Sequence, residues 1–223
     1  QQALRFALKK RDRNVPVVTL ATQVVVDEND PGFKNPTKPI GPFYSEEEAK
    51  AMVEEKGYSV KEDAGRGWRR VVASPIPKKI VEIDSVRKLW DTTIVITCGG
   101  GGIPVIEKAD GSLEGVAAVI DKDFAAELLA EEIEADALII LTEVEKVAVN
   151  FNKPDQQDLA HMTYAEAEKH CADGQFAPGS MLPKVQAAMK FVKANPDKKA
   201  IITSLDRAID ALEGKTGTVI TFA

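Results

Sequence analysis

Short runs of apolar, β-branched residues alternate with helical patterns along this chain, and this alternation limits its fold more than any other feature. The runs span residues 15–26, 94–97, 116–120, 137–141, 200–203 and 218–222. The middle runs are apolar at successive positions, which is typical of strands buried on both faces of a parallel sheet. Between the runs lie two apolar stripes at helical spacing, at Phe124, Leu128, Leu129 and Ile133, and at Val185, Ala188, Met189 and Val192. The pattern predicts an α/β fold, a three-layer αβα sandwich around a mostly parallel sheet.

Residues 27–70 interrupt this alternation. They hold Pro31, Pro36, Pro39 and Pro42, and they contain Ser45 followed three residues later by Glu48, the signature of a helix capping box. The segment is too long for a plain loop. We therefore predict a sheet domain made of residues 1–26 and 71–223, and a small protruding subdomain or lid at 27–70. The alternative is a long surface excursion without function.

The composition excludes several classes of protein. Hydrophobic residues make up 44% and charged residues 29%, so a packed core is expected. The net charge of -6 argues against a nucleic-acid partner. No apolar run is long enough to cross a membrane. Cys98 and Cys171 match no zinc or redox spacing, so we expect reduced thiols in a cytoplasmic protein, and no chemical role for His161 or His170.

A run of four glycines, Gly99, Gly100, Gly101 and Gly102, follows the run at 94–97. Glycines let a backbone approach an anion closely and offer N–H groups to it. The run matches neither a Walker A motif nor a dinucleotide fingerprint. A glycine-rich turn without a ligand is the alternative.

Three further segments carry lysines at candidate sites. Lys122 stands between Asp121 and Asp123 where a helix begins, and either Asp could simply be a helix cap. Lys184 follows Pro183 in a first helical turn, where the helix dipole disfavours a cation, which hints at an anionic ligand; an ordinary surface lysine is the alternative. Lys61 opens a segment, 61–70, with four basic residues, which is either a phosphate site or a solvated surface.

Taken together, these segments resemble the carbamate kinases. The motifs are NPTKPIGPFY at 35–44, KEDAGRG at 61–67, VVASP at 71–75, CGGGGIPV at 98–105, VIDKD at 119–123 and GSMLPK at 179–184. Their order and spacing match along nearly the whole chain, and the first two are specific to carbamate kinases within the amino-acid-kinase superfamily. The resemblance implies the amino-acid-kinase fold and a homodimer formed through the sheet domain.

The resemblance also implies an activity, the reversible conversion of ATP and carbamate to ADP and carbamoyl phosphate with Mg²⁺, often serving ATP synthesis in arginine catabolism. It makes Lys61, Lys122 and Lys184 phosphate-neutralising lysines, and makes Asp123 the residue that orients them or meets Mg²⁺ through water. Gly99 to Gly102 would line the reacting end. The adenine pocket would contain the following residues: Thr142, Glu143, Val144, Val147, Asn150, Phe151 and Met181.

One departure concerns the start of the chain. The family opens with a strand and two glycine-rich loops that help bind carbamate and phosphate, and these motifs are not present here. Leu4, Ala7 and Leu8 predict a helix entered in its middle, so we expect the chain to lack an N-terminal segment. Whether the chain alone is active is left open. The alternatives are a non-catalytic nucleotide-binding or dimerising fragment, and another amino-acid kinase acting on acetylglutamate or UMP.

Overall fold

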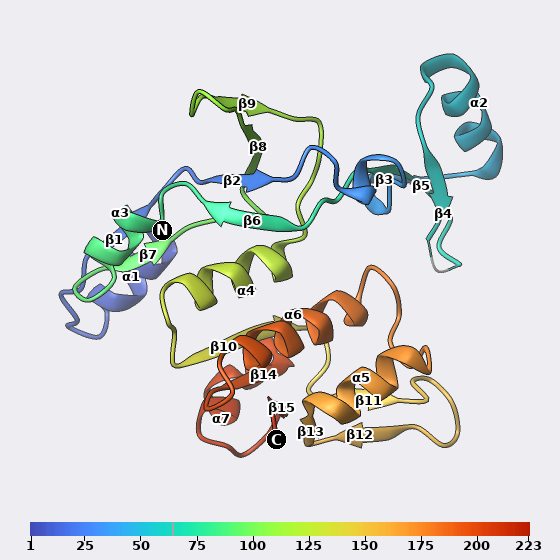
Figure 1. The fold of residues 1–223 in the computed structure, drawn as a ribbon. Coiled ribbons are helices and arrows are strands. Elements are labelled where there is room, and N and C mark those ends of the chain that lie inside the picture. The colour runs from blue at the N-terminus through green and yellow to red at the C-terminus, as the bar shows by residue number, and fades with distance from the viewer. Residues whose placement is uncertain (64) are drawn as a thin grey trace. The chain divides into compact units, whose positions relative to one another are not determined.

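The computed structural model describes residues 1–63 and 65–223. They divide into two compact units, Gln1–Ala125 and Ala126–Ala223. Both units combine helices with strands that pair in parallel and antiparallel fashion, so the predicted α/β class is confirmed (Figure 1). Each unit is described by itself below.

The first unit contains three separate sheets. Its elements are α1 (Gln2–Lys9), β1 (Val17–Thr19), β2 (Gln23–Val26), η1 (Pro31–Phe33), β3 (Lys38–Tyr44), α2 (Glu46–Lys56), β4 (Val60–Glu62), β5 (Trp68–Val72), β6 (Pro77–Ile80), α3 (Ile83–Leu89), β7 (Ile94–Ile96), β8 (Ile103–Glu107) and β9 (Leu113–Gly115). Strand β1 pairs in parallel with β7, and a four-stranded sheet has the order β6-β2-β8-β9. The apolar run at 15–26 therefore serves two sheets, because it breaks after Thr19.

The third sheet of this unit is antiparallel, with the order β3-β5-β4. Helix α2 connects its strands β3 and β4, and Figure 1 shows this helix and the sheet in blue to teal at one end of the unit. The predicted capping box is confirmed: Ser45 accepts a hydrogen bond from the Glu48 backbone, and the Glu48 carboxylate accepts one from the Ser45 backbone. The proposed division of the chain at 27 and 70 stays a prediction.

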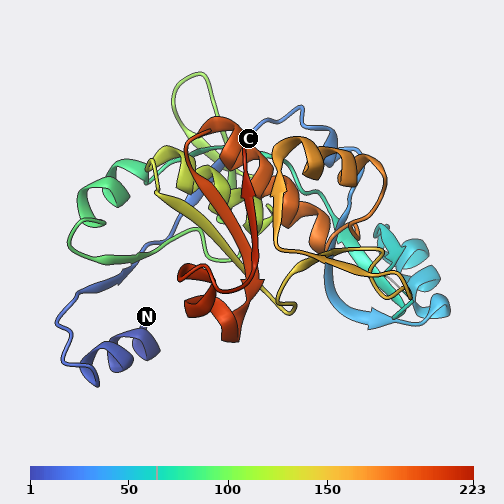
Figure 2. The ribbon, with the colours of Figure 1, turned by 90° about the horizontal axis from the view of Figure 1, so that it is seen from below.

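The second unit is built on a mixed four-stranded sheet with the order β10-β14-β15-β13, and it also contains a separate antiparallel pair, β11-β12. Its elements are β10 (Ala137–Thr142), β11 (Val147–Val149), β12 (Gln157–Leu159), β13 (His161–Thr163), α5 (Tyr164–Ala172), α6 (Met181–Ala194), β14 (Lys199–Ser204), η2 (Leu205–Arg207), α7 (Ala208–Leu212) and β15 (Thr218–Thr221). Helices α5 and α6 pack on each other and on this sheet (Figure 2). Phe191 on α6 and Ile201, Ile202 and Ile220 on the strands are almost fully buried and form the core.

Helix α4 (Lys122–Glu132) begins in the first unit and continues into the second. In the second unit it is tied to α6 by an ion pair, in which the Lys190 ammonium lies 2.7 Å from a carboxylate oxygen of Glu127. Glu127 is only 1% exposed, and its other oxygen has no hydrogen-bond partner among the described residues. The pair joins two helices at the cost of burying a carboxylate.

One predicted strand is wrong. Residues 116–120 form no strand, although they are apolar and β-branched. The Val119 N–H donates to the Ala73 carbonyl, and the Ala118 N–H donates to the carbonyl of Val116 within the same segment. The run is therefore held by single hydrogen bonds and not by a ladder, and helix α4 begins two residues after it.

Candidate functional site

The glycine loop connects β7 to β8. It is entered through Cys98, whose φ is +58° and whose N–H donates to the hydroxyl of Thr22 over 2.9 Å. That hydroxyl also lies 2.7 Å from the hydroxyl of Thr97, so the start of the loop is fixed by two threonines from neighbouring segments. Positive φ angles at Gly99, Gly101 and Gly102 make the turn difficult for other residues.

The two halves of the loop have different surroundings. A Cβ on Gly101 would collide with the Ile120 carbonyl, and one on Gly102 would collide with the side chain of Val24. A Cβ on Gly99 or Gly100 would meet nothing within 4 Å, and both residues are exposed. Close packing therefore requires glycine at positions 101 and 102. At Gly99 and Gly100, by contrast, the backbone is accessible to a ligand.

The first turn of α4 lies beside this loop, because Asp121 directly follows Ile120. An oxygen of Asp121 accepts a hydrogen bond from the Asp123 N–H over 2.9 Å, so Asp121 caps the helix. Its other oxygen lies 2.5 Å from the ammonium of Lys38 on β3. Lys122 is half-exposed, with its ammonium 3.4 Å from a carboxylate oxygen of the buried Asp123. Two carboxylates and two lysines thus meet next to the glycine loop.

The cations also set the charge of Asp121. Burial by itself would raise the pKa of this carboxyl, but the hydrogen bonds from Lys38 and from the Asp123 backbone outweigh it, with help from Lys122. The pKa of Asp121 is lowered as a result, so the group stays ionised at neutral pH. An ionised Asp121 holds the Lys38 ammonium at the start of α4, where the helix dipole also favours an anion.

Lys38 was not singled out from the sequence, while Lys61 was. Lys38 lies opposite Val72 on β5, and Lys61 lies opposite Arg69. Residues directly opposite share a face and successive residues alternate, so Lys38 and Lys61 project from opposite faces of the three-stranded sheet. Lys61 is exposed. The NPTKPIGPFY motif contains Lys38, but its role depends on a strand register that the motif does not encode.

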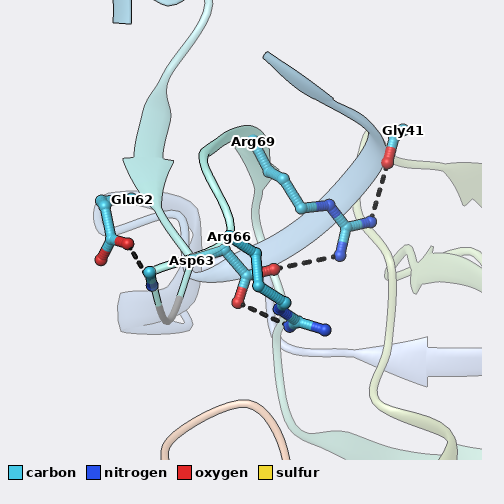
Figure 3. A network of polar contacts seen from close by, with 6 residues as sticks. Gly41, Glu62, Asp63, Arg66 and Arg69 are labelled. Carbon is cyan, nitrogen blue, oxygen red and sulfur yellow. Dashed lines mark hydrogen bonds and ion pairs between the residues drawn. The ribbon is translucent and has the colours of Figure 1, made fainter. Parts of the chain in front are cut away.

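The predicted cationic character of 61–70 is partly neutralised within the segment (Figure 3). Asp63 binds Arg66 over 3.1 Å and Arg69 over 3.3 Å, and Arg69 also donates to the carbonyl of Gly41. Both guanidinium groups lie over the ring of Phe43. These two arginines therefore brace the segment, which leaves Lys61 and Arg70 as its remaining cations.

In the second unit, a cavity of about 420 Å³ opens between the end of β10 and the start of α6. Six of the seven residues expected in the adenine pocket line it, and they are Thr142, Glu143, Val144, Asn150, Phe151 and Met181. The seventh, Val147, is fully buried in β11 and does not line the cavity, whereas its neighbour Ala148 does. A half-apolar cavity with a few polar groups is what an adenine ring requires.

Lys184 lies in the first turn of α6, the helix that Met181 begins. It is 9% exposed, so the alternative of an ordinary surface lysine is wrong. The predicted cation therefore lies buried at the start of α6, in the same unit as the cavity.

The expectation that the cysteines and histidines have no chemical role stays a prediction. Cys98 and Cys171 form no disulfide within the described residues. His161 binds the Thr221 hydroxyl over 2.9 Å, which ties β13 to β15. Within the part of the chain that the structure describes, no three His, Cys, Asp or Glu side chains gather as a metal site, and no helix is long and apolar enough to span a membrane.

Comparison with known proteins identifies the family. The amino acid kinase family matches residues 3–204. A carbamate kinase of Clostridium perfringens is 59% identical over 99% of this chain and 70% of its own length, and the carbamate kinase-like protein YqeA of Escherichia coli is 55% identical over 99% and 71%. The chain belongs to the carbamate kinases. Two solved carbamate kinase structures from Giardia lamblia are similar to this chain. The structure bound to AMP-PNP has a TM-score of 0.85 at 45% identity, and the match covers 99% of this chain and 70% of that one. The structure bound to citric acid has a TM-score of 0.91 at 44% identity, and the match covers 99% of this chain and 69% of that one.

Proposed function

We propose that this protein transfers a phosphoryl group reversibly between ATP and carbamate, giving ADP and carbamoyl phosphate. The observation that carries the proposal is the meeting of open glycine backbone, a helix N-terminus and the Lys38–Asp121 pair in the first unit. Phosphoryl transfer needs positioned cations and backbone N–H groups more than covalent chemistry. Relatives named carbamate kinases support carbamate as the acceptor.

Each predicted residue then has a task. Lys122 and Lys184 neutralise charge on the transferring phosphoryl group, and Lys61 is predicted to do so from residues 27–70. We add Lys38 to this set, because its ammonium is already held at the start of α4. Asp121 and Asp123 hold the lysines in place. Gly99 and Gly100 offer backbone to the oxygens of the carbamoyl group, while Gly101 and Gly102 fix the loop.

The cavity of the second unit is the proposed adenine site. Its lining residues Val144, Phe151 and Met181 supply apolar contact, and Thr142 and Asn150 supply polar groups. The Giardia lamblia relative bound to AMP-PNP, an ATP analogue, supports nucleotide binding by this protein. The buried Val147 would not contact the adenine, but it would support the residues that line the cavity.

Mg²⁺ is proposed to enter with the nucleotide. The oxygens of Asp121 are engaged by Lys38 and a backbone N–H, so they do not form an all-protein cage. Mg²⁺ keeps several waters and prefers substrate phosphates with one or two carboxylates. Asp123 therefore fits as a contact through water, and the ion would supply charge neutralisation on the phosphates.

Two wider proposals follow from the family. Residues 27–70 act as a lid that excludes water from the reacting groups. The protein forms a homodimer through its sheet domain. Sedimentation of the protein at several concentrations tests the dimer, and hydrogen exchange of 27–70 with and without ADP tests the lid. A monomer at all concentrations would contradict the first, and unchanged exchange would contradict the second.

The central experiment measures ATP synthesis from ADP and carbamoyl phosphate, with luciferase luminescence reporting the ATP that is formed. We expect ATP formation that requires both substrates and Mg²⁺. Acetylglutamate and UMP, each supplied with ATP, should yield no phosphorylated product. A protein that binds ADP but forms no ATP from carbamoyl phosphate would favour the alternative, a nucleotide-binding module without catalysis.

A further inference from the structure

A second cavity, separate from the adenine cavity, lies entirely within the first unit. Its volume is about 400 Å³. It is bounded by the end of α2, by β5 and by the segment 117–119 that leads toward α4. None of its lining residues is assigned to substrate, nucleotide or metal in the activity proposed above, although several belong to the proposed lid at 27–70. Its walls are mostly apolar, with Phe33, Pro36, Val71 and Ala118 among them.

Arg70 supplies the charge in this cavity. Its guanidinium carbon lies 3.7 Å from the centre of the Tyr58 ring, which is the distance of close stacking. The Lys56 ammonium lies 6.0 Å from the same ring. Arg66 and Arg69 form ion pairs with Asp63, but Arg70 has no ion pair or side-chain hydrogen bond within residues 1–63 and 65–223. Stacking on Tyr58 orients the guanidinium plane and leaves its N–H edge available.

The polar groups of the cavity can offer hydrogen bonds to a ligand. The hydroxyls of Tyr58 and Ser59 also lack a hydrogen-bond partner in the described part of the chain, and both residues line the cavity. A guanidinium fork matches the two oxygens of a carboxylate. The apolar walls suit a short hydrocarbon or aromatic body, and few donors are present for the several oxygens of a phosphate.

We propose that this cavity is a binding site for a small organic carboxylate, held by Arg70 on its Tyr58 platform. The site borders the reaction site without being part of it. Val72, in the lining, is the register partner of Lys38, and Val119, also in the lining, is two residues from Asp121. A ligand in this cavity therefore contacts Val72, which lies opposite Lys38, and the segment that leads to Asp121.

The test is calorimetric titration of the protein, without nucleotide, with sodium benzoate and in a separate arm with sodium phosphate. We expect benzoate to bind in the millimolar range and more tightly than phosphate. Arg70→Gln should lower the affinity for benzoate at least about tenfold, because it removes a charge-assisted hydrogen-bonded pair. Arg66→Gln, a nearby arginine already paired to Asp63, should leave the affinity unchanged.

A cavity-filling variant, Ala118→Leu, keeps Arg70 and should also abolish benzoate binding, so the proposal stays testable if Arg70→Gln does not fold. Circular dichroism checks the fold of each variant. Absence of benzoate binding to the unmodified protein, equal affinity in Arg70→Gln, or tighter binding of phosphate would overturn the proposal. Displacement of benzoate by carbamoyl phosphate would overturn the separation of this cavity from the reaction site.

Discussion

At the scale of single residues, two of the lysines of residues 27–70, Lys38 and Lys61, can be told apart. Lys38 and Lys61 have the same chemistry and lie in one small sheet, yet only Lys38 reaches a carboxylate at the start of α4. A residue's neighbours across the sheet decide its role here. Both lysines lie within sequence motifs, but the sequence alone points to Lys61 and not to Lys38.

Replacing Lys38 should therefore be more damaging than replacing Lys61. Lys38→Ala removes a positioned cation and leaves Asp121 buried without its partner, so we expect kcat for ATP synthesis to fall by about 10²–10³. Lys61→Ala should raise KM for carbamoyl phosphate with a smaller loss of kcat. Lys50→Ala, an exposed lysine of α2, should change the rate by less than about twofold. A larger kcat loss for Lys61→Ala than for Lys38→Ala would reverse the assignment.

Lys184 offers a test in the second unit. Lys184→Met keeps most of the buried stem but removes the charge, so the fold should survive while kcat drops by about 10²–10³. The affinity for ADP should change much less, because Lys184 does not line the proposed adenine cavity. Lys199→Ala, an exposed lysine at the start of β14, is the control. Steady-state kinetics beside ADP titration separates the two effects, and an unchanged kcat would remove Lys184 from the reaction.

At the scale of elements, the glycine loop shows why four identical residues are not equivalent. The inner pair packs against Ile120 and Val24, and the outer pair faces open space. The sequence predicts a flexible anion-binding run. The structure divides it into a part that holds the loop and a part that can receive a ligand.

Alanine substitutions should reproduce this division. Gly101→Ala forces a Cβ against the Ile120 carbonyl at a φ of +137°, so we expect a loss of a few kcal/mol in stability. Gly100→Ala has room for its Cβ and should keep the melting temperature within a few degrees while lowering kcat. Thermal unfolding and ATP synthesis are measured on both variants. Equal destabilisation of the two proteins would show that the loop is uniform.

Elements also show where sequence reasoning succeeds. The start of α2 is predictable because Ser45 and Glu48 satisfy each other within one helical turn. Residues 116–120 are mispredicted because a strand needs a partner distant in the sequence, and the run finds none; only Ile120 within it is buried. The Lys38–Asp121 pair is missed for the same reason, since 83 residues separate its members.

At the scale of the whole molecule, burial of Glu127 makes stability depend on pH. Burial is the largest cause that raises the pKa of Glu127 from 4.5 to about 7; Lys190 opposes it, and Glu131 adds to it. The folded protein thus retains a proton that the unfolded chain releases between these two values. The contribution of this group to stability is present below pH 4.5 and is lost as the pH rises toward 7.

Glu127→Gln removes that titration. We expect the unfolding free energy of the unmodified protein to fall relative to Glu127→Gln by up to about 3 kcal/mol between pH 4.5 and 7.5. Urea denaturation at several pH values measures it. Glu131→Gln, on the same helix but half-exposed, should show a much smaller change. Parallel pH profiles for Glu127→Gln and the unmodified protein would contradict the raised pKa.

The alternating faces of the three-stranded sheet also limit how this segment can change length. Inserting or deleting one residue within β3 would exchange its two faces and turn Lys38 away from Asp121. Two residues would restore the facing but move the lysine along the strand. Length changes compatible with activity should therefore be confined to the connections between strands. In an engineered series, single-residue insertions into β3 should abolish most of the activity, whereas single-residue insertions beyond its ends should preserve it.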